Sequence, residues 1–330
     1  MLRSSVLRVA PLVCCLLPIT AHDAPRTAVT VVEYLLPRPR AFPHDPAVGA
    51  DGIVWYTDQA NSYIGRLDPA TGKVTDYATP TAMSGPHGIV VAPDGGVWYT
   101  GNFKGRLGRL DPATRAIKEY PLPAAARDPH TPLYHAGKIW FTAQGSNLYG
   151  VLDPASGDVK IFPVPTAGAR PYGLVANPRD GSIWMALFGT NQIGKIDPAN
   201  GALRTYPLPD AGARPRRLVV DATGIVWYTD YARGKLGRLD PATGQVREIP
   251  CPGGDNSQPY AIAAATDGRI WYDESGTDDL VAFDPKTEQA VRVQIPTKGS
   301  VVRNMAVDST RARLWLALSG VQRLGKIELK

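Results

Sequence analysis

Short apolar runs alternate with turn residues along the chain, and this alternation repeats. In one repeat the apolar run at 88–92 is followed by a Pro-Asp-Gly turn, a strand around Trp98, and an alternating strand at 106–110. A turn then begins with Asp111 and a proline, the order favoured in a type I turn, and another strand follows at 116–121. The pattern predicts four short β-strands in each repeat.

The tryptophans give the period of this repeat. They are 42 to 44 residues apart, and they are Trp55, Trp98, Trp140, Trp184, Trp227, Trp271 and Trp315. A period of 40–50 residues built from short strands is typical of a propeller with one four-stranded sheet per repeat. We therefore predict an all-β fold, a seven-bladed β-propeller of four-stranded blades spanning residues 28–330, and expect the tryptophans to pack between blades.

The two ends of the repeat array complement each other. Residues 30–37 resemble the strands that close later repeats, at 117–123 and 203–209, whereas the last repeat ends at 324–330 without such a strand. We predict that the N-terminal strand completes the last blade, which removes the open sheet edge that a linear array would expose.

The first 27 residues differ from the repeats. Residues 1–21 resemble a secretory signal peptide, with Arg3 and Arg8 before an apolar run at 9–19 that is too short to span a bilayer. Residues 22–27 are interpreted as a tether. We expect a periplasmic or secreted protein without a stable membrane span. Only Cys251 remains beyond the signal, and one cysteine cannot form an internal disulfide.

Charge narrows the choice of partners. The formal charge of +6 is not gathered in a Lys/Arg block with interleaved aromatic residues, so we expect no nucleic-acid partner. The Asp-Pro turns lack the alternating carboxylates of calcium loops. The expected partner is a small-molecule or peptide-like ligand bound at the end of the central channel of a monomer.

The residue ahead of each inner strand should face one end of that channel. These residues stand 10–12 positions before each tryptophan and are His44, His87, His130, Tyr172, Arg216, Tyr260 and Arg303. A second set follows each tryptophan by three or four positions and includes the carboxylates Asp58, Asp230 and Glu274. Imidazoles, carboxylates and arginines around one opening suit an anionic or carbonyl-bearing ligand, so we predict that both sets bind substrate.

Four motifs carry a family resemblance: Pro-His-Gly-Ile at 86–89, Trp-Tyr-Thr, Ile-Gly-Arg at 64–66, and Glu-Tyr-Pro-Leu-Pro at 119–123. Over residues 28–330 they resemble the virginiamycin B lyase family. The resemblance implies a seven-bladed propeller that opens a cyclic depsipeptide antibiotic by elimination and uses Mg²⁺. It also implies a histidine base for the proton alpha to the ester carbonyl and a metal-bound carbonyl that stabilises the enolate.

The family's active positions lie in its last two blades, and this sequence changes all of them. Tyr260 stands for the first histidine, residues 301–303 (Val-Val-Arg) stand for Glu-Pro-His, and Ser319 stands for the final glutamate. Neither Tyr260 nor Arg303 is a base at neutral pH. Streptogramin lyase activity at that position is therefore not expected.

A similar constellation occurs elsewhere in the ring. His87 in the second blade is followed by Asp128-Pro129-His130 in the third, although Gln144 replaces the final glutamate. We predict that His87, His130 and Asp128 are the catalytic residues, with His44 beside them. His87 or His130 would be the base, and Asp128 would orient it or hold a cation such as Mg²⁺. A polar channel lining without chemistry remains the alternative.

Three functions stay open at this stage. The first is a carbon–oxygen lyase acting on a cyclic ester or lactone, and the second is a non-catalytic propeller that binds a ligand or a protein. The third is a metal-dependent lactonase of the gluconolactonase type, which would need Glu, Asn and Asp on the inner strands. Inner strands such as 174–176 and 262–264 offer none of these ligands. The propeller fold does not decide among them.

Overall fold

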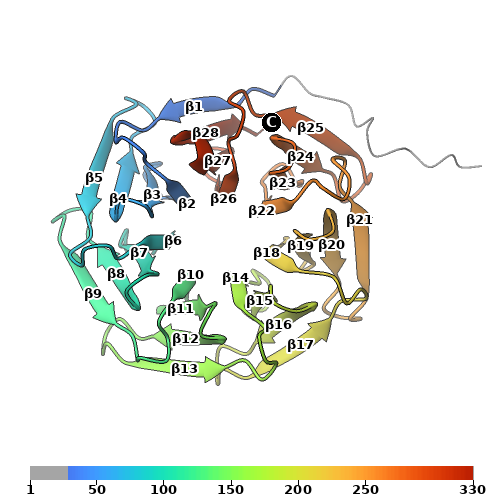
Figure 1. Cartoon of the computed structure of the whole chain (residues 1–330), viewed down its shortest axis with the longest axis horizontal. Coiled ribbons are helices and arrows are strands. Elements are labelled where there is room, and N and C mark those ends of the chain that lie inside the picture. The colour runs from blue at the N-terminus through green and yellow to red at the C-terminus, as the bar shows by residue number, and fades with distance from the viewer. Residues whose placement is uncertain (1–28, 330) are drawn as a thin grey trace, which may run out of the picture.

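The computed structural model describes residues 29–329. The expected signal peptide (1–21) and tether (22–27) lie outside this range. Within it, the chain forms seven four-stranded antiparallel sheets arranged in a ring (Figure 1). The predicted all-β, seven-bladed propeller is confirmed. No helix among these residues has the length and apolar character needed to cross a membrane.

Each blade contributes one strand to each of four concentric positions (Figure 1). The inner strands are β2 (Pro43–Val48), β6 (Pro86–Val91), β10 (Pro129–His135), β14 (Pro171–Ala176), β18 (Pro215–Val220), β22 (Pro259–Ala264) and β26 (Val302–Asp308). The second strands are β3 (Val54–Asp58), β7 (Val97–Gly101), β11 (Lys138–Ala143), β15 (Ile183–Leu187), β19 (Val226–Asp230), β23 (Ile270–Glu274) and β27 (Arg313–Leu318).

The third strands and the outer strands follow in the same order. The third strands are β4 (Tyr63–Leu67), β8 (Arg106–Leu110), β12 (Leu148–Leu152), β16 (Gln192–Ile196), β20 (Lys235–Leu239), β24 (Asp279–Phe283) and β28 (Arg323–Glu328). The outer strands are β5 (Val74–Ala78), β9 (Ile117–Pro121), β13 (Val159–Pro163), β17 (Leu203–Pro207), β21 (Val246–Pro250), β25 (Ala290–Gln294) and β1 (Val32–Leu35). One 3₁₀ turn, η1 (Ser319–Val321), precedes β28.

The ring closes through the first strand. β1 pairs antiparallel with β28, with Val32 opposite Lys326 and Leu35 opposite Arg323. Figure 1 shows the two strands side by side, although they come from opposite ends of the chain. The predicted closure is confirmed. The last sheet gains its fourth strand in this way, and the pairing between the chain ends also fixes the circumference of the channel.

The tryptophans pack between neighbouring blades, as predicted. Trp55 of the first blade shares a buried apolar cluster with Ile89, Val97 and Tyr99 of the second. In three blades the tyrosine that follows the tryptophan (Tyr56, Tyr99 and Tyr228) lies over a glycine of the third strand. A Cβ added at Gly108 would lie 2.1 Å from the ring of Tyr99, so only glycine fits at this crossing.

In four blades a threonine of the second strand (Thr57, Thr100, Thr142 and Thr229) connects the blade to the next. Thr100 Oγ1 accepts a hydrogen bond from the Gly88 amide at 2.9 Å and donates one to the His130 carbonyl at 2.8 Å. Equivalent donations run from Thr57 to the His87 carbonyl and from Thr142 to the Tyr172 carbonyl. Each threonine therefore fixes the channel-facing residue of the following blade relative to its own.

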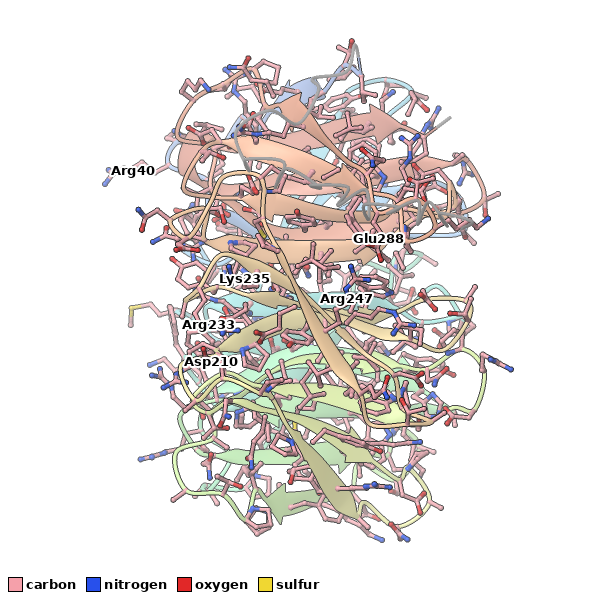
Figure 2. The ribbon with its side chains drawn as sticks, turned by 90° about the vertical axis from the view of Figure 1, so that its right-hand side faces the viewer. Arg40, Asp210, Arg233, Lys235, Arg247 and Glu288 are labelled. Atoms are coloured by element: carbon pink, nitrogen blue, oxygen red, sulfur yellow. The ribbon has the colours of Figure 1, made fainter. Side chains whose placement is uncertain are left out.

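Charged side chains on the side of the ring are largely paired. Figure 2 shows Arg233 beside Asp210, and the two side chains form an ion pair at 2.7 Å. It also shows Arg247 beside Glu288, and this ion pair connects the fifth and sixth blades. Exposed pairs of this kind each contribute at most about 1 kcal/mol. The ring is held together mainly by its buried inter-blade packing.

Candidate functional site at the channel mouth

One residue of each inner strand forms a ring at one end of the channel, called here the mouth ring. It consists of His44, His87, His130, Tyr172, Arg216, Tyr260 and Arg303, the second residue of each strand. In every blade the pairing with the second strand is interrupted at this point, as between Pro86 and Ile89 in β6. Such an irregularity releases residues from the sheet ladder and redirects their side chains. The predicted convergence of these seven side chains on the channel is supported by their contacts.

The three histidines lie one on another around one side of the mouth. The ring centroids of His44 and His87 are 3.7 Å apart, as are those of His87 and His130, and the His130 ring lies 4.0 Å from that of Tyr172. None of these three histidines is more than 5 % exposed. Three imidazoles from three consecutive blades thus form one continuous wall.

Neighbouring side chains orient two of these imidazoles. His44 Nδ1 lies 2.8 Å from the Asp45 carboxylate, and His130 Nδ1 lies 3.0 Å from Thr131 Oγ1. A carboxylate acceptor requires the proton of His44 on Nδ1, which leaves Nε2 with a free lone pair. His87 Nδ1 is buried and has no hydrogen-bond partner.

The electrostatic environment keeps the three histidines neutral. Burial lowers the pKa of His87 well below its ordinary value, and the neighbouring histidines and arginines lower it further. Burial also lowers the pKa of His130 strongly, and that of His44 falls despite the Asp45 carboxylate. A neutral imidazole has a lone pair that can accept a proton, but the lowered pKa also makes these imidazoles weaker bases than an exposed histidine.

Arginines and tyrosines form the opposite side of the mouth. The guanidinium carbon of Arg216 lies 4.1 Å from the centre of the Tyr260 ring, and that of Arg303 lies 5.7 Å from the same ring. The hydroxyls of Tyr172 and Tyr260 are hydrogen-bonded to each other. The mouth therefore has an imidazole side, from blades one to three, and a guanidinium side, from blades five and seven.

An ion pair lies one residue deeper than the mouth ring. Asp45 Oδ1 accepts a hydrogen bond from Arg217 at 2.8 Å, and both side chains are buried. A cavity of about 180 Å³ continues on the inner strands beyond this pair, lined in part by Thr131 and Asn304. The sequence analysis missed Asp45 and Arg217. The available signal was their position, directly after two residues of the mouth ring.

The three carboxylates expected to bind substrate are directed elsewhere. Asp58 accepts hydrogen bonds from the Phe42 amide at 3.0 Å and from Asn61. Asp230 accepts a hydrogen bond from the Arg214 amide at 2.9 Å, and Glu274 accepts one from the Gly253 amide at 2.9 Å. All three are at most 1 % exposed. Their contacts fix the loop that leads into the inner strand of their own blade, and no contact connects them with the mouth.

Asp128 has a similar role within its blade. Its carboxylate accepts hydrogen bonds from the Gly145 amide, from the Ser146 amide at 3.1 Å, and from the Ser146 hydroxyl. These donors belong to the turn between β11 and β12. The carboxylate therefore stabilises the turn that faces the start of β10, and it supports His130 through the backbone.

The donor atoms near the mouth do not suit Mg²⁺. One group, His44, Asp45 and His87, has donor atoms within 4.8 Å of one another. Mg²⁺ prefers an octahedron of oxygen atoms, whereas this group offers two nitrogens and one carboxylate that already binds Arg217. The expected Mg²⁺ does not fit these residues, and the chemistry proposed below does not depend on it.

Comparisons with known proteins agree with this architecture. The model of the "Virginiamycin B lyase family" matches residues 24–188 and 175–330. The chain belongs to this family. A search of the curated proteins by sequence gives no match.

Solved structures of family members are similar over nearly their whole length. One titled as a streptogramin B lyase is 26 % identical, with a TM-score of 0.83, over 91 % of this chain and 98 % of the other. The virginiamycin B lyase of Staphylococcus aureus is 24 % identical, with a TM-score of 0.84, over 91 % and 99 %. The hydrazine synthase of Kuenenia stuttgartiensis, at 15 % identity and a TM-score of 0.73 over 92 % and 97 %, shares the fold alone.

Proposed function

We propose that this propeller is a carbon–oxygen lyase that opens a cyclic ester or lactone by histidine-assisted elimination at the channel mouth. The observation that carries the proposal is the wall of three neutral imidazoles facing guanidinium groups across one opening. Family membership supports the choice of elimination, since relatives of known structure are named streptogramin B lyase and virginiamycin B lyase.

The proposed step needs a base and a group that stabilises negative charge. His87 or His130 takes the proton from the carbon next to a carbonyl, and the electron pair moves into an enolate. The positive charge of the two guanidinium groups, Arg216 and Arg303, stabilises the enolate through the field at the mouth, without a direct contact. The electrons then form a carbon–carbon double bond as the adjacent C–O bond breaks, and the ester oxygen leaves as part of a carboxylate. No water is consumed.

The mass of the product tests this proposal. The protein is incubated with a streptogramin B and with a panel of lactones, each with and without Mg²⁺, and the products are weighed by mass spectrometry. Elimination gives an opened isomer with the mass of the starting ring but a new carboxylate, so chromatography separates it from unreacted substrate, whereas hydrolysis adds one water. We expect the wild-type protein to give the elimination product, and we expect His87→Ala and His130→Ala to lose this activity. Full turnover in both variants would overturn the assignment of the base.

A second candidate is a propeller that binds its ligand without chemistry. It is favoured by the low exposure of the imidazoles, which are packed as tightly as a core. In that case the ligand would raise the melting temperature of the protein and be recovered unchanged. A lactonase ranks third, because the carboxylates beside the mouth ring are already engaged: Asp45 pairs with Arg217, and Asp273 accepts a hydrogen bond from the Tyr260 amide. We also propose export to the periplasm or beyond, supported by the basic start and apolar run of residues 1–21.

A further inference from the structure

Arg216 and Arg303 carry charges that residues 29–329 leave unbalanced. Neither side chain makes an ion pair in this part of the chain, whereas Arg217, the residue after Arg216, pairs with Asp45. The Nε atoms of Arg216 and Arg303 are buried and have no hydrogen-bond partner. An uncompensated charge that is partly withdrawn from water is costly, so these two groups are suited to a partner that arrives with the ligand.

Aromatic rings hold Arg216 in place. Its guanidinium carbon lies between 4.1 and 5.2 Å from the centres of four rings, those of Tyr172, Phe188, Tyr231 and Tyr260. Contacts between a guanidinium and aromatic faces are attractive, and they restrict the rotamers of the side chain. A positive group fixed before binding loses little conformational entropy when it meets an anion.

The rest of the mouth does not supply the missing negative charge. The histidines beside the guanidinium groups are neutral, for the reasons given above. The nearest carboxylate, Asp45, already accepts hydrogen bonds from His44 and Arg217. The mouth ring as a whole therefore carries net positive charge.

We propose that Arg216 and Arg303, whose guanidinium carbons lie 4.1 and 5.7 Å from the centre of the Tyr260 ring, bind an oxyanion of the ligand, a carboxylate or a phosphate. The substrate is accordingly an acidic compound with an ionised group beside the ester that is cleaved. Guanidinium groups bind both oxyanions through paired N–H donors, which an uncharged ring cannot match. This inference rests on the proposed use of the mouth as the ligand site, but it does not require catalysis.

Binding of simple anions to the whole protein tests the inference. Inorganic phosphate and citrate are titrated by calorimetry, with glycerol as the uncharged comparison, against wild type and the variants Arg216→Gln and Arg303→Gln. We expect at least one anion to bind to the wild-type protein, with an affinity that falls about tenfold or more in each variant. Arg66→Gln, which removes the same charge from β4, is the matched control and is expected to bind within about twofold of wild type.

The outcomes separate this inference from the proposed function. His87→Ala and His130→Ala are expected to lose turnover and keep anion binding. Anion binding that depends on Arg216 and Arg303, in a protein without activity on any ester, overturns the lyase and leaves the oxyanion site in place. Equal affinity in wild type and both arginine variants, or no binding of either anion, overturns the oxyanion site. Phosphate bound more tightly than citrate would identify the group as phosphate.

Discussion

The carboxylate of Asp45 on the first blade lies 2.8 Å from the guanidinium of Arg217 on the fifth, so that one ion pair spans the central channel. Burial alone would raise the pKa of Asp45, but Arg217 and His44 more than offset it, and the pKa is lowered. The ionised pair separates the mouth ring from the cavity beyond it. It also connects two blades that are not neighbours in the ring.

Removal of one partner of this pair is expected to be more harmful than removal of both. Arg217→Met leaves the Asp45 charge buried without its main partner, and we expect a loss of about 3–5 kcal/mol in the free energy of unfolding. The double variant Asp45→Leu, Arg217→Met leaves no such charge and should recover much of that loss. Urea denaturation of both proteins measures the difference. A double variant as unstable as Arg217→Met would contradict a desolvated pair.

Asp273 is expected to make the stability of the ring depend on pH. It stands where four other blades have the connecting threonine, and it accepts hydrogen bonds from the Tyr260 and Ala261 amides. Burial raises its pKa to about 7. The folded protein therefore holds this proton at pH values where the unfolded chain has lost it. As the pH rises from about 4 to 7, the free energy of unfolding should therefore decrease, by a few kcal/mol at most.

Two substitutions at this position provide the test. Asp273→Thr restores the connecting residue of the other blades, so it should raise stability at pH 7 and flatten the profile of stability between pH 4 and 7. Asp273→Asn removes the titration and keeps nearly the same shape, so it should flatten the profile as well. Chemical denaturation at several pH values gives the profile. An unchanged slope in Asp273→Thr would show that another group is responsible for it.

The connecting threonines themselves are expected to contribute to stability through two hydrogen bonds each. Thr100→Val keeps the shape of the side chain but leaves the Gly88 amide and the His130 carbonyl without that partner. Each buried group left unsatisfied costs about 1–3 kcal/mol, so a total loss of about 2–4 kcal/mol is expected. Thr100→Ser retains the hydroxyl and serves as the control. Equal losses in the two variants would point to the methyl group instead.

The repeat is what made the fold predictable from the sequence. Tryptophans with one period, turn residues with the same period, and an unmatched first strand leave few alternatives to a closed seven-bladed ring. The mouth ring followed from the same logic, because each member has the same place in its repeat. Arg216 and Tyr260 are as predictable in this respect as His87.

The interactions between distant blades could not be predicted in this way. Asp45 and Arg217 are 172 positions apart, and no periodicity relates a carboxylate in one blade to a guanidinium four blades later. Asp58 shows a different limit. Thr57 lies next to the channel-facing residues, and the side chains of a strand alternate, so the neighbouring carboxylate points away from them. Attention to this alternation would have removed Asp58 from the expected substrate-binding residues.

Cys251 is expected to resist thiol reagents as long as the ring is intact. It is a free cysteine, it is fully buried in a cluster that connects the fifth and sixth blades, and burial together with Glu274 raises the pKa of its thiol. Since the thiolate is the reactive form, alkylation by iodoacetamide at pH 8 should be far slower in the native protein than in urea. A Cys251→Ser variant that carries Ala113→Cys, at an exposed turn, is the control and should react at a similar rate in both conditions. Rapid native alkylation of Cys251 would mean that the contact between these two blades opens readily, and the rate would then measure how often it does so.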